Sequence, residues 1–548
     1  MWEAPWLEMK FEGIGMILKQ GFAIWLGWAC LALGTAICGA QAAPAPTAPP
    51  SGAAPPSSTT DTKAPAKQEL NQQTPDKPAT ETHLTSAQAK ELFRSVDEIL
   101  HFASDDSKLP VKHDVKRKLQ TRASVEKYVV EKFNDDQDAK RMQRSEIVLK
   151  KFGLLDRDFQ LKPFLVSLLT EQIAGYYDSK TKTVNLLDWI APDSQKPVLA
   201  HELTHALQDQ HVDLNKWEDK TLDNISKNVA DDSRHVETDE ADTARDAVLE
   251  GQAMAVFVDY SLKPSGKTLL TTPDIGSAGL DDLTDTSDSP VMARAPLLLQ
   301  ESLLFPYREG LSFEQKLMKD QGVEQAFAGV LDRPPSSSYE ILNPKSYERK
   351  EKPPLLQMPD IHGLIDDQYD PYDIGVMGAL DVRILTKLFA GDDAAVALTP
   401  EWDGGIYYAA QSKTAKTEAQ KEQTSSVSLL YLSAWKSADA AKTFAAIYAD
   451  ELSRKYQGVK RDKEAESPGE QIYKTNEGPV LIALSGNDVF TSEGFDLTLA
   501  HKLELLMVGA QANGNAQTVR AIPVERDLSG EVTKFIGKCG LMKAVLPH

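Results

Sequence analysis

The stretch PVLAHELTHALQDQH, Pro197 to His211, constrains this 548-residue chain more than any other segment. Three of the ten histidines of the chain fall within it. We expect a helix opened by Pro197, since proline is tolerated at a first helical position. Each helical residue advances about 100°, so His205 lies about 40° around from His201. Two imidazoles on one helix face can then bind one cation, with Glu202 beside them.

The pattern His-Glu-x-x-His is typical of zinc peptidases, in which the glutamate takes a proton from a water activated by the metal. Tetrahedral zinc with an open water position needs a third protein ligand. His211 is one alternative, but a continuing helix would point it about 240° away from His205. Glu250, on a second helix predicted from about Asp239 to Leu262, is the preferred ligand. The small residues after it, in EGQA, would allow a close approach.

HELTH followed by EGQA resembles the gluzincin type of zinc metallopeptidase. The match is closer to a poorly characterised group of secreted bacterial proteins, which carry a strand-turn like IAGYYDSKTKTVNLL before AHELTHALQDQH and an EGxA helix. The resemblance covers roughly residues 90 to 350 and departs at Asn343, where that group has a histidine. It implies that His201, His205 and Glu250 bind Zn²⁺, with Glu202 as the general base for hydrolysis of a peptide or protein substrate.

The same resemblance implies two further features of a peptidase site. The substrate would lie extended along an edge strand, at about Thr183 to Leu187. A second group would stabilise the tetrahedral oxyanion. The candidates for that group are His235, Tyr260, Tyr307, Tyr339 and Tyr347.

The N-terminus is typical of an exported bacterial protein. Lysines precede the apolar run GFAIWLGWACLALGTAICGA, and Ala40-Gln41-Ala42 is a small-x-small site, so residues 1–42 are interpreted as a signal peptide. An uncleaved membrane anchor is the alternative, because the run has nearly the length of a membrane span. Residues 43–84, rich in Pro, Ala, Ser and Thr, are predicted to be a disordered linker. The expected location is therefore the periplasm or the exterior.

The remaining chain is predicted to have an α+β fold. Residues 85–369 would form a mostly helical, zincin-like metallopeptidase domain with a small sheet and a helical N-terminal cover. The small sheet would contain a hairpin around Asp-Ser-Lys. Two helices are expected at 295–305 and 313–331. Residues 370–548 would form a smaller α+β domain, in which GIYYAA, SVSLLYLSAW and PVLIALSGNDVFTS are strands.

Composition limits the other functions of the chain. Its net charge of −21 argues against a general nucleic-acid binder, which needs a cationic face. Cys30 and Cys38 lie in the signal, so Cys539 alone remains and no cysteine-ligated zinc site can form. Two alternatives to an active exported peptidase stay open: a catalytically silent, zinc-stabilised binding or scaffold protein of the cell envelope, and a self-inhibited protease. The oligomeric state is not specified by the sequence.

Overall fold

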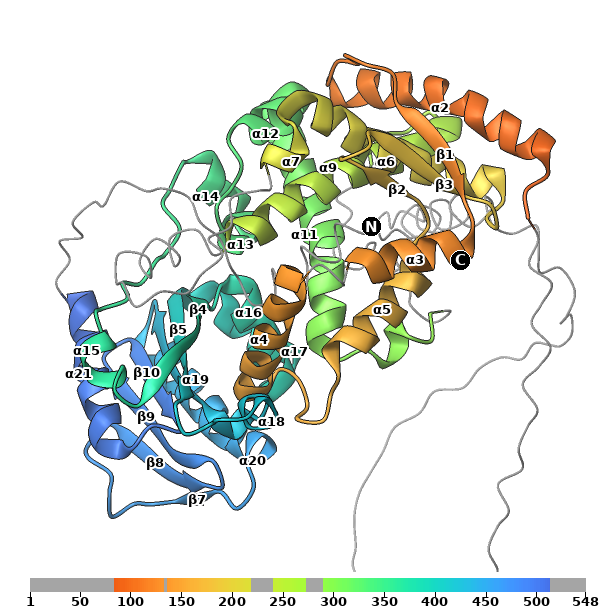
Figure 1. Ribbon diagram of the computed structural model, residues 1–548. Coiled ribbons are helices and arrows are strands. Elements are labelled where there is room, and N and C mark those ends of the chain that lie inside the picture. The colour runs from red at the N-terminus through yellow and green to blue at the C-terminus, as the bar shows by residue number, and fades with distance from the viewer. Residues whose placement is uncertain (1–82, 133–135, 218–239, 273–288, 513–548) are drawn as a thin grey trace, which may run out of the picture. The chain divides into compact units, whose positions relative to one another are not determined.

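The computed structural model describes residues 83–132, 136–217, 240–272 and 289–512 (Figure 1). The predicted signal peptide and nearly all of the predicted linker lie outside these residues, as do His235 and Cys539. Within the described ranges, no helix has both the length and the apolar character needed to cross a membrane. Export and the membrane tether therefore stay predictions.

The described chain has a mixed α+β fold, as predicted, with one sheet of three strands and one of seven. All described residues fall within one compact unit of the chain. The predicted domain boundary after residue 369 coincides with the first residues of strand β4 (Tyr369–Val376). The division into two domains stays a prediction.

The smaller sheet consists of β1 (Lys116–Gln120), β2 (Tyr176–Asp178) and β3 (Thr183–Leu187), in the order β1-β3-β2. The predicted hairpin is confirmed as the antiparallel pair β2–β3, and β1 pairs with β3 in parallel. The prediction that Thr183–Leu187 is an edge strand is wrong. Strand β3 is central and hydrogen-bonded on both sides, so it cannot pair with a substrate peptide.

Helices make up most of the described residues before β4. Those that lie against the small sheet or against one another are α2 (Ser86–Ser107), α3 (Arg122–Lys132), α4 (Asp136–Phe152), α5 (Leu161–Gln172), α6 (Pro192–Val212), α7 (Leu214–Trp217), α9 (Ala241–Leu262), α11 (Leu297–Gln321), α12 (Val330–Asp332), α13 (Ser338–Leu342) and α14 (Pro344–Glu348). Short 3₁₀ turns are η1 (Lys263–Ser265) and η2 (Met292–Arg294), and η3 (Gln325–Gly329) is a π-helical turn.

Two helix boundaries differ from the prediction. Helix α6 begins at Pro192, which takes the first helical position, and Pro197 lies inside the helix. The helix expected at 295–305 and the first half of the one expected at 313–331 form one long helix, α11, which continues through Pro306, whereas the rest of the second helix is replaced by η3 and the start of α12. Most residues of α11 from Leu298 to Met318 are buried, so tertiary packing offsets the helix-breaking tendency of the proline.

The larger sheet is antiparallel throughout, with the order β4-β5-β6-β10-β9-β8-β7. Its further strands are β5 (Trp402–Ser412), β6 (Val427–Trp435), β7 (Lys460–Arg461), β8 (Glu470–Thr475), β9 (Gly478–Ser485) and β10 (Asp488–Glu493). The helices and 3₁₀ turns of this region are α15 (His362–Ile365), α16 (Ala379–Ala390), α17 (Asp392–Leu398), η4 (Thr399–Glu401), α18 (Glu418–Lys421), η5 (Thr424–Ser426), α19 (Ala438–Asp450), α20 (Leu452–Lys455) and α21 (Leu497–Ala512). The strands predicted in GIYYAA, SVSLLYLSAW and PVLIALSGNDVFTS are confirmed.

Candidate metal centre

Helix α6 carries the predicted histidine pair through the middle of the core. Every residue from Val198 to Asp209 is buried, because α2, α9 and the β2–β3 hairpin pack around this helix. His201 is fully buried and His205 is 9% exposed. Their Nε2 atoms lie 3.0 Å apart, and their ring planes meet at 84°. The spacing of one helical turn thus brings both rings to the same point.

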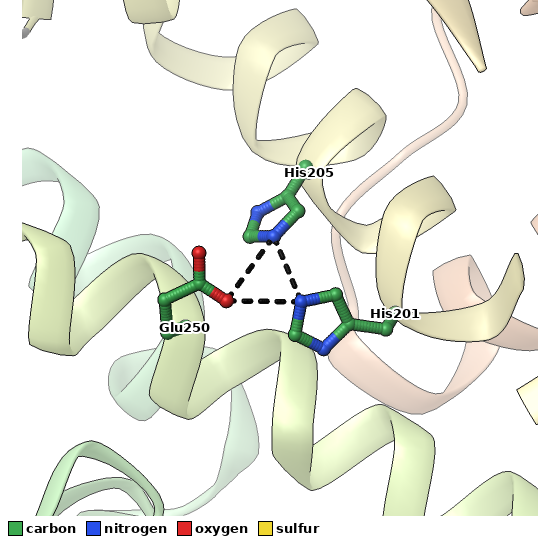
Figure 2. Close-up of side chains that lie close together, drawn as sticks. All are labelled: His201, His205 and Glu250. Atoms are coloured by element: carbon green, nitrogen blue, oxygen red, sulfur yellow. Dashed lines mark hydrogen bonds and ion pairs between the residues drawn. The ribbon is translucent and has the colours of Figure 1, made fainter. Parts of the chain in front are cut away.

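Glu250 of helix α9 completes the group (Figure 2). Its Oε2 atom lies 2.9 Å from His201 Nε2 and 3.5 Å from His205 Nε2. The carboxylate is only 4% exposed, because α9 packs along α6. The structure therefore brings together the three side chains that the sequence singles out as ligands.

The separations of the three atoms are within about 0.4 Å of those on one face of a tetrahedral zinc site, and two of them are shorter. Ligand atoms at 2.0–2.2 Å from a tetrahedral zinc ion lie about 3.3–3.6 Å from one another. The separations here are 3.0, 2.9 and 3.5 Å. Apart from the two imidazoles, the buried Glu250 Oε2 has no hydrogen-bond partner among the described residues. Two ring nitrogens and one carboxylate oxygen are also a donor set that zinc takes in catalytic sites, so the group fits this ion.

Burial and mutual proximity shift the pKa of each of these three groups. Burial lowers the pKa of His201 to about 4, so its ring is neutral. Burial also acts to lower the pKa of His205, but the Glu250 carboxylate outweighs it and raises this pKa to about 9. Burial acts to raise the pKa of Glu250, whereas His205 and His201 bring it down to about 2. The carboxylate is therefore ionised at neutral pH.

Glu202 lies beside this group and is also buried, at 1% exposure. Its Oε2 accepts a hydrogen bond from the backbone N–H of Tyr177 at 2.7 Å. Its Oε1 is buried and has no hydrogen-bond partner within the described part of the chain. Burial raises the pKa of Glu202 to about 7. The carboxylate is thus held at one oxygen, while the other is available to carry a proton near neutral pH.

Tyr177 of strand β2 connects the hairpin to α6 at two points. Besides its N–H bond to Glu202, its hydroxyl donates to Asp209 Oδ2 at 2.6 Å. Lys182 Nζ donates to both oxygens of the same carboxylate, at 2.8 and 2.7 Å. These contacts fix the strand that orients Glu202 against the helix that carries it.

A glycine is needed at position 251 for a different reason from the predicted one. A Cβ atom at this position would lie 2.3 Å from the backbone C and O atoms of Gly310 in α11. In turn, a Cβ at Gly310 would lie 2.2 Å from the carbonyl oxygen of Ala247. The glycine therefore allows α9 to cross α11, and not α6. The effect of Gly251 on the candidate metal ligands His201, His205 and Glu250, here called the metal group, is indirect, since the glycine fixes the position of the helix that carries Glu250.

Tyr307 is the oxyanion candidate that the structure places beside the metal group. Its ring is stacked on His201, with centroids 6.2 Å apart and an interplanar angle of 21°. Tyr260 instead packs edge-on against Phe102, and Tyr347 donates its hydroxyl to a backbone carbonyl 14 residues earlier. Tyr339 packs against the ring of Trp402. His235 lies outside the described residues.

His211 and Asn343 have partners of their own. His211 Nε2 lies 2.9 Å from Asp332 Oδ1, so the ring at the end of α6 faces α12. The exposed Asn343 side chain donates to the carbonyl oxygen of Tyr339 at 2.9 Å, where α13 ends. The side chain at position 343 thus closes a short helix in this chain.

Sequence reasoning missed the residues that contact the metal group on the side away from the three converging ligand atoms. Gln208 accepts a hydrogen bond from the far side of the His205 ring, and Gln252 lies beyond it. A signal for Gln208 was present, because it stands three residues after His205 and so on the same helix face. For Gln252 and Tyr177 the signal was weaker, since their contacts come from tertiary packing.

Comparison with known proteins gives no match: no family model, no curated protein sequence and no solved structure is significantly similar to this chain.

Proposed function

We propose that this chain is an exported zinc metallopeptidase of the gluzincin type with a zincin-like catalytic region. The observation that carries the proposal is the convergence of His201 Nε2, His205 Nε2 and Glu250 Oε2 in one buried group, with Glu202 next to it. The apolar N-terminal segment is the basis for export to the periplasm or the exterior.

His201, His205 and Glu250 would hold the zinc ion, which lowers the pKa of water and polarises a carbonyl group when bound. Glu202 would act as the general base. Its Oε2 is engaged by Tyr177, so the proton would be taken up at Oε1 and passed from there to the leaving amine. A pKa near 7 suits a group that both accepts and releases a proton at neutral pH.

Two measurements on the purified full chain test this proposal. Elemental analysis should find about one zinc per chain in the wild type and in Glu202→Gln, and much less in Glu250→Ala. Cleavage of unfolded protein or of a fluorogenic peptide library should be present in the wild type and lost in Glu202→Gln. His211→Ala is the matched control, since this histidine lies on the same helix but outside the group, and it should keep zinc and activity. Full zinc in Glu250→Ala, or cleavage by Glu202→Gln, would contradict the assignment.

The deep burial of the group favours one second candidate. His201, Glu202 and Glu250 are each at most 4% exposed, as expected for a structural zinc site in a binding or scaffold protein. This candidate predicts full zinc occupancy, a melting temperature that falls when zinc is chelated, and no turnover of any peptide. Zinc-dependent cleavage by the wild type decides between the two.

A further inference from the structure

The far side of the His205 ring is held by two buried amide side chains. His205 Nδ1 lies 2.8 Å from Gln208 Oε1, and Gln208 Nε2 donates to Gln252 Oε1 at 2.9 Å. Gln208 Nε2 also donates to the carbonyl oxygen of Leu249 at 3.0 Å. Both glutamines have no exposed surface. The amides therefore link the metal helix α6 to α9 directly beside Glu250.

The orientation of this amide pair is fixed from its far end. Gln252 Nε2 donates to the backbone carbonyl oxygens of Ala326 and Phe327 in η3, at 3.0 and 3.1 Å. Carbonyl oxygens only accept hydrogen bonds, so the NH₂ group of Gln252 must face them and its oxygen must face Gln208. The same reasoning, with Leu249 as the acceptor, turns the NH₂ group of Gln208 away from His205.

The orientation of Gln208 determines the tautomer of His205. Because Gln208 presents its oxygen, His205 Nδ1 must carry a hydrogen and donate it. A cation binds only a ring that has given up its second proton, and in that neutral ring the lone pair lies at Nε2, the atom that faces His201 and Glu250. His201 differs, since its Nδ1 is buried and has no hydrogen-bond partner in the described ranges. Of the two imidazoles, only that of His205 thus has a hydrogen-bond partner on its Nδ1 atom within the described residues.

We propose that Gln208 and Gln252 are positioning residues, which fix His205 in its Nδ1–H form and so present Nε2 to a cation. The backbone carbonyls of the π-helical turn η3 anchor the pair. A π-helical turn at this place agrees with the frequent occurrence of such turns near functional sites. The role of the two glutamines rests on the proposed zinc site, because a ligand tautomer matters only where the ring binds metal.

The test compares zinc affinity with stability in single variants of the full chain. Zinc affinity is measured by competition of Zn²⁺ with a chromophoric chelator, and stability of the metal-free chain by urea unfolding. Gln208→Met removes the acceptor and should weaken zinc binding about 10- to 100-fold. Gln208→Glu keeps an acceptor for Nδ1–H but loses both donated bonds. It should therefore bind zinc within a few-fold of the wild type although it is less stable.

Two further variants separate positioning from general damage to the fold. Gln252→Met leaves Gln208 intact but removes the group that orients it, so zinc affinity should fall several-fold. Gln195→Met is the matched control: Gln195 is also buried on α6 and also bonds backbone groups, those of Leu187 and Ile190, but lies away from the metal group. It should lose stability and keep zinc affinity.

The outcomes distinguish this inference from the proposed function. Wild-type zinc affinity in Gln208→Met, or equal weakening in Gln208→Glu and Gln208→Met, would overturn the positioning role even if the chain is a peptidase. Conversely, a chain that binds zinc with the expected ranking of variants but cleaves no peptide would leave the positioning role standing and refute the peptidase. A wild type that binds no zinc would refute both.

Discussion

The crossing of α9 and α11 allows a quantitative prediction for Gly251→Ala. The new methyl group would meet the backbone C and O atoms of Gly310 at 2.3 Å. Backbone atoms cannot rotate away as a side chain can, so the two helices must separate by roughly 1 Å to restore van der Waals contact. Overpacking of this kind costs about 1–3 kcal/mol.

Two opposing terms decide the net change in stability. Replacing a helical glycine by alanine gains up to about 1 kcal/mol of helix propensity. Because the new methyl group meets backbone atoms, the overpacking cost should lie in the upper half of its range, at about 2–3 kcal/mol, and the net loss for Gly251→Ala should be about 1–2 kcal/mol. Glu250 directly precedes this position, so a shift of α9 also moves the carboxylate away from the two imidazoles. We expect zinc affinity to fall about tenfold or more.

Urea unfolding of the metal-free chain and chelator competition for Zn²⁺ measure the two effects. Gly509→Ala is the matched control, because Gly509 lies in helix α21 and has no atom within 4 Å of a Cβ at its position. That substitution should stabilise the chain slightly and leave zinc binding unchanged. In the double variant Gly251→Ala/Gly310→Ala the costs should not add, since the two positions share one crossing. A Gly251→Ala chain as stable and as zinc-avid as the wild type would refute the reasoning.

Three other substitutions test parts of the fold and site. Burial raises the pKa of Glu314 well above 4.5, so the folded chain keeps a proton that the unfolded chain releases, and stability falls by up to about 1.4 kcal/mol per pH unit above about 4.5. Urea unfolding at pH 5 and pH 7 should show that Glu314→Gln lacks this fall in stability. The same pH slope in Glu314→Gln as in the wild type would contradict a protonated Glu314. Glu493→Gln leaves the fully buried ammonium of Lys455 without its anionic partner, so the free energy of unfolding in the same assay should fall by about 3–5 kcal/mol. A fall below about 1 kcal/mol would show that this ion pair is not critical for stability. Tyr177→Phe removes the hydroxyl bond to Asp209. If the proposed peptidase function holds, peptide cleavage should show a kcat several-fold lower, and elemental analysis an unchanged zinc content. An unchanged kcat would mean that this bond does not position Glu202, the proposed general base.

Local periodicity explains which features the sequence predicts well. The positions of His201 and His205 follow from the helical repeat, and a strand of the larger sheet such as β6 follows from a short, mostly apolar run that contains aromatic residues. Pairings distant in sequence are not encoded in this way. The glycine at 251 is recognisable as exceptional, but its partner Gly310 is found only when α11 is placed across α9. Likewise β3 becomes central only through β1, whose polar sequence KRKLQ has no pattern typical of a strand.

The unpaired oxygen of Glu202 helps to distinguish a catalytic from a structural zinc site. A structural site has no use for a second buried acid beside its three ligands, of which only Glu250 is an acid. Folding raises the pKa of this carboxyl from 4.5 to about 7, so the folded chain loses stability as the pH rises through this interval. Above pH 7 the loss is on the order of 3 kcal/mol in the metal-free chain. Glu202→Gln should therefore raise the free energy of unfolding at pH 8, but not at pH 4, while it abolishes cleavage. Stability given up for activity is expected at a catalytic residue. A Glu202→Gln chain that is no more stable at pH 8 than the wild type would remove this argument for catalysis.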